Sequence, residues 1–362
     1  MSCKSFSHRT GRITIAVAAL VAVWLAFGAV GARTAPPALD GVPAFGHVFL
    51  IVGENASFSE ITARHAPYIT GTLRPGGAWL TRYSALADGS LANYAAMVSG
   101  QFVRCENNND FSFTNGDIPG QHACHQGVDN LFHQLDVRGI SWQEWTESAD
   151  NPCDLFDHGT TWAQNLFSAH HSPAPYFDDI QAHHSSEDVL PSLECRQKVL
   201  PTGTSGPDDM STFDARLTSG DVARFDMIIP NDCENGHDRC GTHDSVRQFD
   251  DFLAREVPKI QASPAFGADG LIIVLWDEGA DPPLAPRHVG AALIGPRVTP
   301  SVTDAEHLTH YSLLRTLQDG FGITRHLAHA ARAKAITGIW HSERPAADRS
   351  ITGPRRRLGP SS

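Results

Sequence analysis

Short runs of apolar residues rich in valine, isoleucine and leucine recur along the chain, and each ends in a polar, glycine or proline turn. Four are mainly apolar and place apolar residues on both faces: Phe45–Val52, Phe225–Ile229, Leu271–Trp276 and Val289–Ile294. Such runs are typical of strands buried on both faces, as in a parallel sheet between helices. Segments with helical periodicity separate them: Leu91–Ser99, Val128–Val137, Ser245–Ile260 and His310–Phe321. The alternation predicts an α/β fold built on a parallel sheet.

The two ends of the chain differ from this pattern. Three basic residues precede an apolar run from Ile13 to Val30, and small residues follow it. This layout predicts a signal peptide over residues 1–32 and a secreted protein, with an uncleaved N-terminal membrane anchor facing outward as the alternative. Residues 33–345 form the expected domain. Residues 346–362 are rich in Pro, Gly and Arg and predict a disordered basic tail.

The cysteines agree with export. One of the seven, Cys3, lies in the signal segment, and an even set in an exported chain predicts disulfides. Cys233 with Cys240 is the favoured pair, and sequential pairing of all six would close three modest loops. We expect a loop-rich, disulfide-tied insertion between Cys105 and Cys240. Zinc ligation is the weaker alternative because the chain has no Cys-x-x-Cys pair.

Charge narrows the class of partner. The chain has 28 Lys and Arg against 40 Asp and Glu, a formal charge of −12 at pH 7. This sign disfavours nucleic-acid binding, and no stable protein partner is indicated. The 19 histidines would offset the negative charge at acidic pH, which makes an acidic working pH conceivable.

Polar side chains follow three of the predicted strands. Because ligands bind at the carboxyl ends of strands in open parallel sheets, we expect these groups to converge at one edge. Carboxylate and amide oxygens suit Mg, Ca or Mn, and the imidazole leaves Zn or Fe possible. One acidic residue alone would more often cap a helix or end a strand in solvent, but three strand ends with the same chemistry predict a metal and phosphate site. The residues are Glu54, Asn55, Asn231, Asp232, His237, Asp238, Asp277 and Glu278.

Ser90 is the candidate nucleophile. It follows Asp88-Gly89 and precedes an apolar helical segment, so its hydroxyl lies at or near a helix N-terminus, which attracts anions. A serine there could attack phosphorus, with Asn93 on the same turn of chain. The alternative is a serine that only caps the helix. No Gly-x-Ser-x-Gly motif is present at this serine, which disfavours a carboxylesterase.

Together these segments resemble the secreted phosphoesterase family, which unites bacterial acid phosphatases with phospholipases C. The similar blocks keep the family's order and span roughly residues 45–325. They are His47 to Asn55, Ser90-x-x-Asn93-Tyr94, Pro230-Asn231 with Gly236-His237-Asp238, Trp276 to Gly279, and His310 to Thr316.

The resemblance implies an alkaline-phosphatase-like fold and assigns roles. Ser90 would form a phosphoryl-enzyme, and Asn93 would help bind phosphate. His237 and Asp238 would hold phosphate oxygens or protonate the leaving group. Arg315 is expected to brace the last helix. The positions that match the family's metal ligands are Glu54, Asn55, Asp277 and Glu278.

Some positions depart from the family pattern. The family usually has His-Pro before the nucleophile and Pro before the asparagine, whereas this chain has Asp88, Gly89 and Ala92. Asp88 therefore places a negative charge beside an anionic substrate, which could lower activity, require another cation or indicate a divergent substrate. His288 is an uncertain contributor to phosphate binding, since a lone histidine is more often structural.

The other histidines and the tryptophans have ordinary explanations. We expect His170-His171 and His183-His184 to be solvated, although metal binding or an access channel would also fit. A cluster of tryptophans is expected to pack in the core or at its edge rather than to form a lipid-facing rim. These are Trp142, Trp145 and Trp162.

The sequence thus predicts a secreted phosphoesterase that depends on a divalent metal ion (Ca, Mg, Mn or Zn) and acts through a serine phosphoryl-enzyme. An acid phosphatase on monoesters is favoured because the chain lacks long extra C-terminal domains. The alternatives are a phospholipase C-type phosphodiesterase on phospholipid head groups, a catalytically silent exported binding protein and a metal-independent serine hydrolase.

Overall fold

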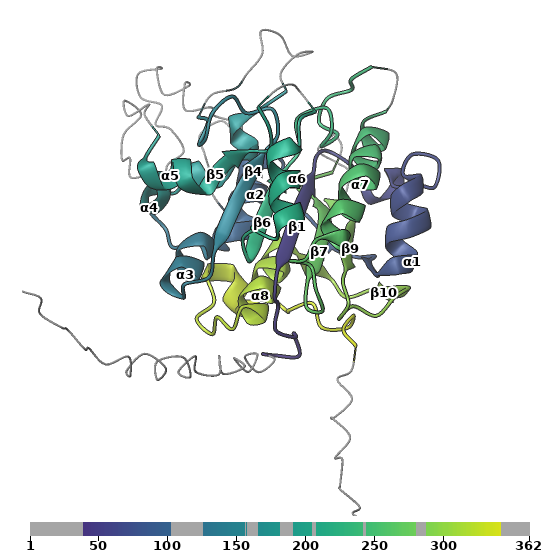
Figure 1. Cartoon of the computed structure of the whole chain (residues 1–362). Coiled ribbons are helices and arrows are strands. Elements are labelled where there is room, and N and C mark those ends of the chain that lie inside the picture. Colours follow the sequence, from purple (N-terminus) through teal and green to yellow (C-terminus); the bar gives the residue numbers. More distant parts are fainter. Residues whose placement is uncertain are drawn as a thin grey trace, which may run out of the picture. The chain divides into compact units, whose positions relative to one another are not determined.

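The computed structural model describes most of the predicted domain (Figure 1). The described residues are 39–102, 126–155, 157, 166–181, 191–204, 208–241, 244–279 and 287–341. The predicted signal segment and basic tail lie outside them, as do Cys105, Cys124, Trp162 and His183-His184. Within the described residues, no helix is long and apolar enough to cross a membrane.

The centre of the fold is an eight-stranded sheet. Its strands, in spatial order, are β10 (Val302–Asp304), β2 (Ala78–Leu80), β9 (Ala291–Ile294), β7 (Leu271–Trp276), β1 (Val48–Gly53), β6 (Phe225–Ile229), β4 (Trp142–Thr146) and β5 (Val199–Pro201). A three-stranded sheet is formed by β11 (Leu308–Thr309), β3 (Tyr83–Ser84) and β8 (His288–Val289). The runs predicted at residues 225–229 and 271–276 match β6 and β7.

The large sheet is mixed rather than wholly parallel. β9 runs antiparallel to β2 and β7, while the pairings of β1, β6, β7, β4 and β5 are parallel. The run predicted as one strand over Val289–Ile294 divides into β8 and β9 at Gly290, where a Cβ would lie 2.4 Å from Ile61 and 2.8 Å from Trp276. A strand buried on both faces has the same apolar pattern whether it runs parallel or antiparallel to its neighbours. The sequence pattern therefore could not distinguish a parallel from a mixed sheet.

Helices cover both faces of this sheet. In the view of Figure 1, α6 (Ser211–Ser219) and α7 (Ser245–Ala262) lie in front of the strands, whereas α2 (Ser90–Ser99) lies behind and packs against α8 (His310–Gly320). The four predicted helices correspond to α2, α3 (Leu131–Val137), α7 and α8. Arg315 of α8 pairs with Asp319 at 2.8 Å and with Asp40, which confirms that it braces this helix.

Shorter helical turns complete the described domain. The short α-helices are α1 (Arg74–Gly76), α4 (Asp178–Gln181) and α5 (Leu193–Lys198). Short 3₁₀ helices occur at η1 (Phe58–Glu60), η4 (Ala169–His171), η5 (Ala174–Tyr176) and η6 (Ala328–Arg332). A short π-helix forms η2 (Ile69–Leu73).

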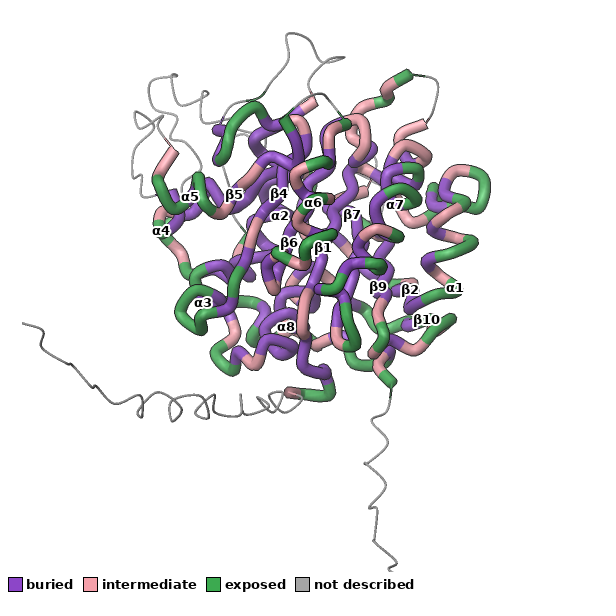
Figure 2. The backbone as a smooth tube through the Cα atoms, viewed as in Figure 1, coloured by how far each residue is buried: buried purple, intermediate pink, exposed green. Residues whose placement is uncertain are grey.

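The apolar core surrounds the central strands (Figure 2). β1, β6 and β7 are buried along their whole lengths. Trp142 and Trp145 of β4 are also buried, so they pack in the core and form no lipid-facing rim.

Two disulfides fasten the polar middle of the described chain. The predicted Cys233–Cys240 bridge is confirmed, and Cys153 pairs with Cys195, as sequential pairing requires. Structural disulfides are characteristic of proteins outside the reducing cytosol.

Asp226 is a buried carboxyl group inside β6. Its Oδ1 accepts a hydrogen bond of 2.8 Å from Trp145 Nε1, and burial raises the pKa of Asp226 to about 8. The folded state therefore retains a proton that the unfolded chain releases near pH 4. As a result, folding stability falls as pH rises from about 4 through 8, by up to about 1.4 kcal/mol per pH unit for this group.

We expect Asp226→Asn to remove this pH dependence. The amide preserves the acceptor for Trp145 but cannot ionise, so the free energy of unfolding of the variant should exceed that of the wild type by a margin that grows from pH 5 to pH 8. Urea unfolding at each pH measures the margin. A margin that does not change with pH would mean that Asp226 is ionised in the folded protein.

Candidate functional site

The sheet order explains why distant polar residues meet. β7, β1 and β6 are adjacent and parallel, with Gly53 beside Trp276 and Ile51 beside Ile228. Glu54 and Asp277 therefore leave the sheet side by side, and the amide of Glu54 donates 2.8 Å to the carbonyl of Asn235. The structure thus brings the three predicted strand ends to one edge.

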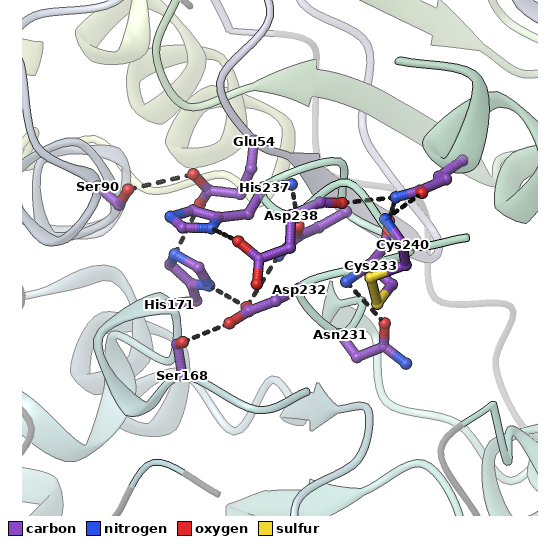
Figure 3. A network of polar contacts seen from close by, with 12 residues as sticks. Glu54, Ser90, Ser168, His171, Asn231, Asp232, Cys233, His237, Asp238 and Cys240 are labelled. Atoms are coloured by element: carbon purple, nitrogen blue, oxygen red, sulfur yellow. Dashed lines mark hydrogen bonds and ion pairs between the residues drawn. A yellow bond between two sulfur atoms is a disulfide. The ribbon is translucent and has the colours of Figure 1, made fainter. Parts of the chain in front are cut away.

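Ser90 reaches the same edge from α2. It is the first residue of the helix, and Gly89 precedes it with φ of 117°, a conformation that favours glycine. Ser90 is 3% exposed, and its Oγ donates 3.1 Å to Glu54 Oε2 (Figure 3). The hydroxyl therefore faces the acidic strand end rather than capping the helix backbone.

Asn93 holds the loop before Ser90 in place. Its Oδ1 accepts from the amides of Leu86 and Ala87 at 3.0 and 3.2 Å, and its Nδ2 donates to the carbonyls of Ala87 and Gly89, both at 3.1 Å. These bonds explain why an asparagine follows the serine by three residues. They place its amide on the loop that presents Ser90.

Three carboxylates surround the Ser90 loop. Glu54 and Asp277 are buried, and Glu278 Oε2 accepts from the Gly89 amide at 2.5 Å. Burial, together with the charges of Asp277 and Glu278, raises the pKa of Glu54 well above its usual range. Burial also raises the pKa of Asp277 to about 6. Their mutual repulsion makes the group costly without a compensating cation or proton.

This donor set fits a divalent cation. Within the described chain, neither carboxylate oxygen of Asp277 has a hydrogen-bond partner, and the partner of Glu54 Oε1 is an imidazole, His171 Nε2, at 3.3 Å. Buried acceptors of this kind are rare unless a ligand satisfies them. Asn55, which follows Glu54 with φ of 53°, adds an amide oxygen to the predicted set. All these donors are oxygens, the ligand type that Mg, Ca and Mn prefer.

A buried pair of aromatic residues fixes the backbone of Asp277. His310, the first residue of α8, has its Nε2 2.7 Å from the Asp277 carbonyl and its Nδ1 3.0 Å from the Tyr83 hydroxyl. Burial lowers the pKa of His310 to about 4, so the ring is neutral near pH 7. Tyr83 and His310 thereby support a predicted metal ligand through its main-chain carbonyl.

The other side of Ser90 is lined by imidazoles (Figure 3). His171 is buried, with Nδ1 3.0 Å from Asp232 Oδ1 and Nε2 3.3 Å from Glu54 Oε1. His237 has Nδ1 2.9 Å from Asp238 Oδ1 and is partly exposed. Each carboxylate fixes its ring and leaves Nε2 toward the site.

His170 joins these two rings. One nitrogen from each of His170, His171 and His237 lies within 4.8 Å of the others, a spacing that could hold a metal ion or an anion. The expectation that His170-His171 is solvated was wrong: both are buried, since η4 turns them inward and Ser168 donates 2.5 Å to Asp232. The two histidines follow no predicted strand, so the strand-end argument did not find them.

His288 has different partners from the other predicted site residues. Its Nε2 lies 2.7 Å from the Thr81 carbonyl, and its ring stacks on Phe58 with centroids 4.2 Å apart. These contacts hold β8 against the segment after β2. The structure therefore gives His288 packing contacts, while it joins Glu54, Ser90 and Glu278 directly through the nucleophile loop.

The described chain has an alkaline-phosphatase-like fold, a mostly parallel sheet between helices. A protein of the alkaline phosphatase superfamily from Vibrio parahaemolyticus superposes with a TM-score of 0.53, 14% identity and coverage of 79% of this chain and 68% of that one. Murine ectonucleotide pyrophosphatase/phosphodiesterase 5, solved with AMP, superposes with a TM-score of 0.50 and 11% identity. The match covers 78% of this chain and 96% of the murine chain. At these identities the likeness establishes the fold.

The chain belongs to the Phosphoesterase family, whose sequence profile matches residues 63–324. It is 26% identical over 330 residues to a phosphatidylinositol-3-phosphatase of Mycobacterium tuberculosis, covering 91% of this chain and 92% of that protein. A phosphate-repressible acid phosphatase of Penicillium chrysogenum is 23% identical over 250 residues, covering 68% of this chain and 52% of the fungal protein. The family resemblance is confirmed, and the protein is a hydrolase of phosphoric esters.

Proposed function

We propose that the protein is an exported, metal-dependent acid phosphatase that cleaves phosphate monoesters through a phosphoseryl intermediate on Ser90. The observation that carries the proposal is the Ser90 hydroxyl, which is buried at the N-terminus of α2 and hydrogen-bonded to Glu54. A helix N-terminus favours the phosphate anion, and the acceptor orients the hydroxyl for attack.

In the first half of the reaction, Ser90 Oγ forms a bond to phosphorus as the bond to the ester oxygen breaks. Glu54 Oε2 accepts the hydroxyl hydrogen in the structure and is placed to take this proton. His237, whose Nδ1 is held by Asp238, gives a proton from Nε2 to the leaving oxygen. His171 is held at Nδ1 by Asp232 and has its Nε2 3.3 Å from Glu54 Oε1; with substrate bound, this Nε2 would donate to a phosphate oxygen.

In the second half, water attacks the phosphoseryl group and the Oγ–P bond breaks. His237 is then placed to remove the proton from this water, in reverse of its first role. Inorganic phosphate leaves, and Ser90 regains its proton. The loop contacts of Asn93 and Glu278 keep Ser90 in one position through both halves.

A divalent cation would be held by Glu54, Asn55, Asp277 and Glu278. When bound, such an ion neutralises these carboxylates and the charge that develops on the phosphoryl oxygens. The buried oxygens of Asp277 that lack a hydrogen-bond partner support this assignment. The identity of the ion is expected among Mg, Ca, Mn and Zn.

Export and monoester preference complete the proposal. The basic and apolar layout of residues 1–32 and the two disulfides support export. The mycobacterial relative is named for a phosphoinositide substrate, so a phosphorylated lipid head group is a candidate monoester.

The proposal is tested by hydrolysis of p-nitrophenyl phosphate and bis-p-nitrophenyl phosphate from pH 4 to 9, with and without a chelator. We expect faster turnover of the monoester, an acidic optimum and loss of activity with chelator that added divalent metal restores. A preference for the diester would favour the phospholipase C alternative. Carboxylic-ester turnover that survives chelation would contradict the proposal.

A further inference from the structure

Asp88, which lies two residues before Ser90, has a cationic partner in the structure. Arg287 Nε lies 3.4 Å from Asp88 Oδ1, and Arg287 Nη1 donates to the carbonyl of Leu86. The backbone of Arg287 is tied to the same loop, since its carbonyl accepts 2.7 Å from the amide of Ala85. Arg287 therefore contacts the segment before Ser90 through both its backbone carbonyl and its side chain.

The charge balance at this loop shows why such a partner matters. Asp88 precedes Ser90 by two residues, and Glu278 contacts the intervening Gly89. The approach to Ser90 thus carries acidic groups where a phosphate ester, itself an anion, must arrive. A guanidinium is always ionised and presents several N–H donors in a fixed plane. It can therefore neutralise Asp88 and donate to a backbone carbonyl at the same time.

We propose that Arg287 is a positioning residue that neutralises Asp88 and thereby permits a phosphate dianion to reach Ser90. The inference rests on the proposed function. Asp88 and Arg287 have side chains 53% and 48% exposed, so their contribution to stability is small. Their effect is instead on substrate charge, because Coulomb repulsion scales with the charge of the approaching ester.

The inference is tested by a cycle of Arg287→Ala, Asp88→Asn and the double variant. Arg287→Ala should raise KM for p-nitrophenyl phosphate and the inhibition constant of inorganic phosphate by about three- to tenfold, with a smaller change in kcat. Asp88→Asn in the same chain should restore both constants to within about twofold of the wild type, because the repelling charge is gone.

Three further readouts separate charge from structure. These assays are run at about pH 7.5, where the monoester is a dianion because its second pKa is near 6. The increase in KM should shrink at high salt and should be smaller for the monoanionic bis-p-nitrophenyl phosphate than for the dianionic monoester. Arg287→Lys, which keeps the charge, should restore most of the lost affinity. Thermal unfolding of each variant reports any loss of folding.

Arg216→Ala is the matched control. Arg216 is 37% exposed and pairs with Asp221 at 3.7 Å, but this pair precedes β6 and so lies toward the opposite edge of the sheet from Ser90. Its KM should equal that of the wild type. An equal increase in KM in this control would attribute the effect to net charge and overturn the inference.

A double variant as impaired as Arg287→Ala would also overturn the inference, since Arg287 would then act without Asp88. Ser90→Ala, assayed alongside, separates this result from failure of the proposed function. If the wild type shows no turnover, or turnover persists in Ser90→Ala, the proposed function fails and the inference fails with it. If only the rescue is missing, the inference alone is wrong.

Discussion

Ser90→Ala lowers kcat/KM for phosphate monoesters by at least about 10³-fold, because the variant has no oxygen to form the bond to phosphorus. The fold should be unaffected, since Ser90 Oγ makes its hydrogen bond to Glu54 rather than to the helix backbone. Initial rates over a range of substrate concentrations measure the loss, and thermal unfolding checks the fold.

The same helix supplies the control for this variant. Ser99 is also buried in α2, and its Oγ donates 2.7 Å to the carbonyl of Ala95. Ser99→Ala therefore removes a buried hydroxyl from the helix without touching the site, and its activity should match the wild type. Retention of activity in Ser90→Ala would show that Ser90 is not the nucleophile.

Asp277→Asn should abolish tight binding of the divalent cation and lower turnover by more than about 100-fold. The variant keeps nearly the same shape but removes one negative charge from the acidic group of Glu54, Asp277 and Glu278, of which Glu54 and Asp277 are buried. Metal content after dialysis, measured by elemental mass spectrometry, and isothermal titration of the apoprotein report the binding. Activity with saturating metal reports the catalytic loss.

Asp226→Asn is the control for this second variant. Asp226 is equally buried on the neighbouring strand β6, but its carboxyl group bonds to Trp145 inside the core. Its variant should bind metal and turn over substrate as the wild type does. If Asp277→Asn retained full metal content, the cation would have to be held elsewhere, for example at the imidazole group of His170, His171 and His237.

The part of the fold that the sequence predicted is the part that carries the site. β1 and β7 are apolar on both faces, and β6 departs from this pattern at Asp226. The polar residues that follow the strands were enough to predict that Glu54 and Asp277 converge. The rule that parallel strands present their carboxyl ends at one edge of the sheet predicted that these residues lie close together in space. The Cys233–Cys240 bridge was also predicted, and it joins two cysteines separated by 7 positions in the sequence.

Other features depend on packing that periodicity does not record. The direction of β9 is set by its neighbours, and the turn at Gly290 is set by the close approach of Trp276. His171 enters the site from a single helical turn in a polar segment. Tyr83 and His310 meet because β11, which leads directly into α8, pairs with β3. Such contacts between segments far apart in the sequence leave no periodic pattern in it.

The central claim is that phosphorus is transferred to Ser90. The most direct test quenches the wild-type protein in acid during turnover of p-nitrophenyl phosphate and measures the intact mass and the modified peptide. We predict a species heavier by one phosphoryl group, located on Ser90 and absent from Ser90→Ala but present in Ser99→Ala. Turnover with phosphate on another residue, or a mass increase that survives in Ser90→Ala, would contradict it.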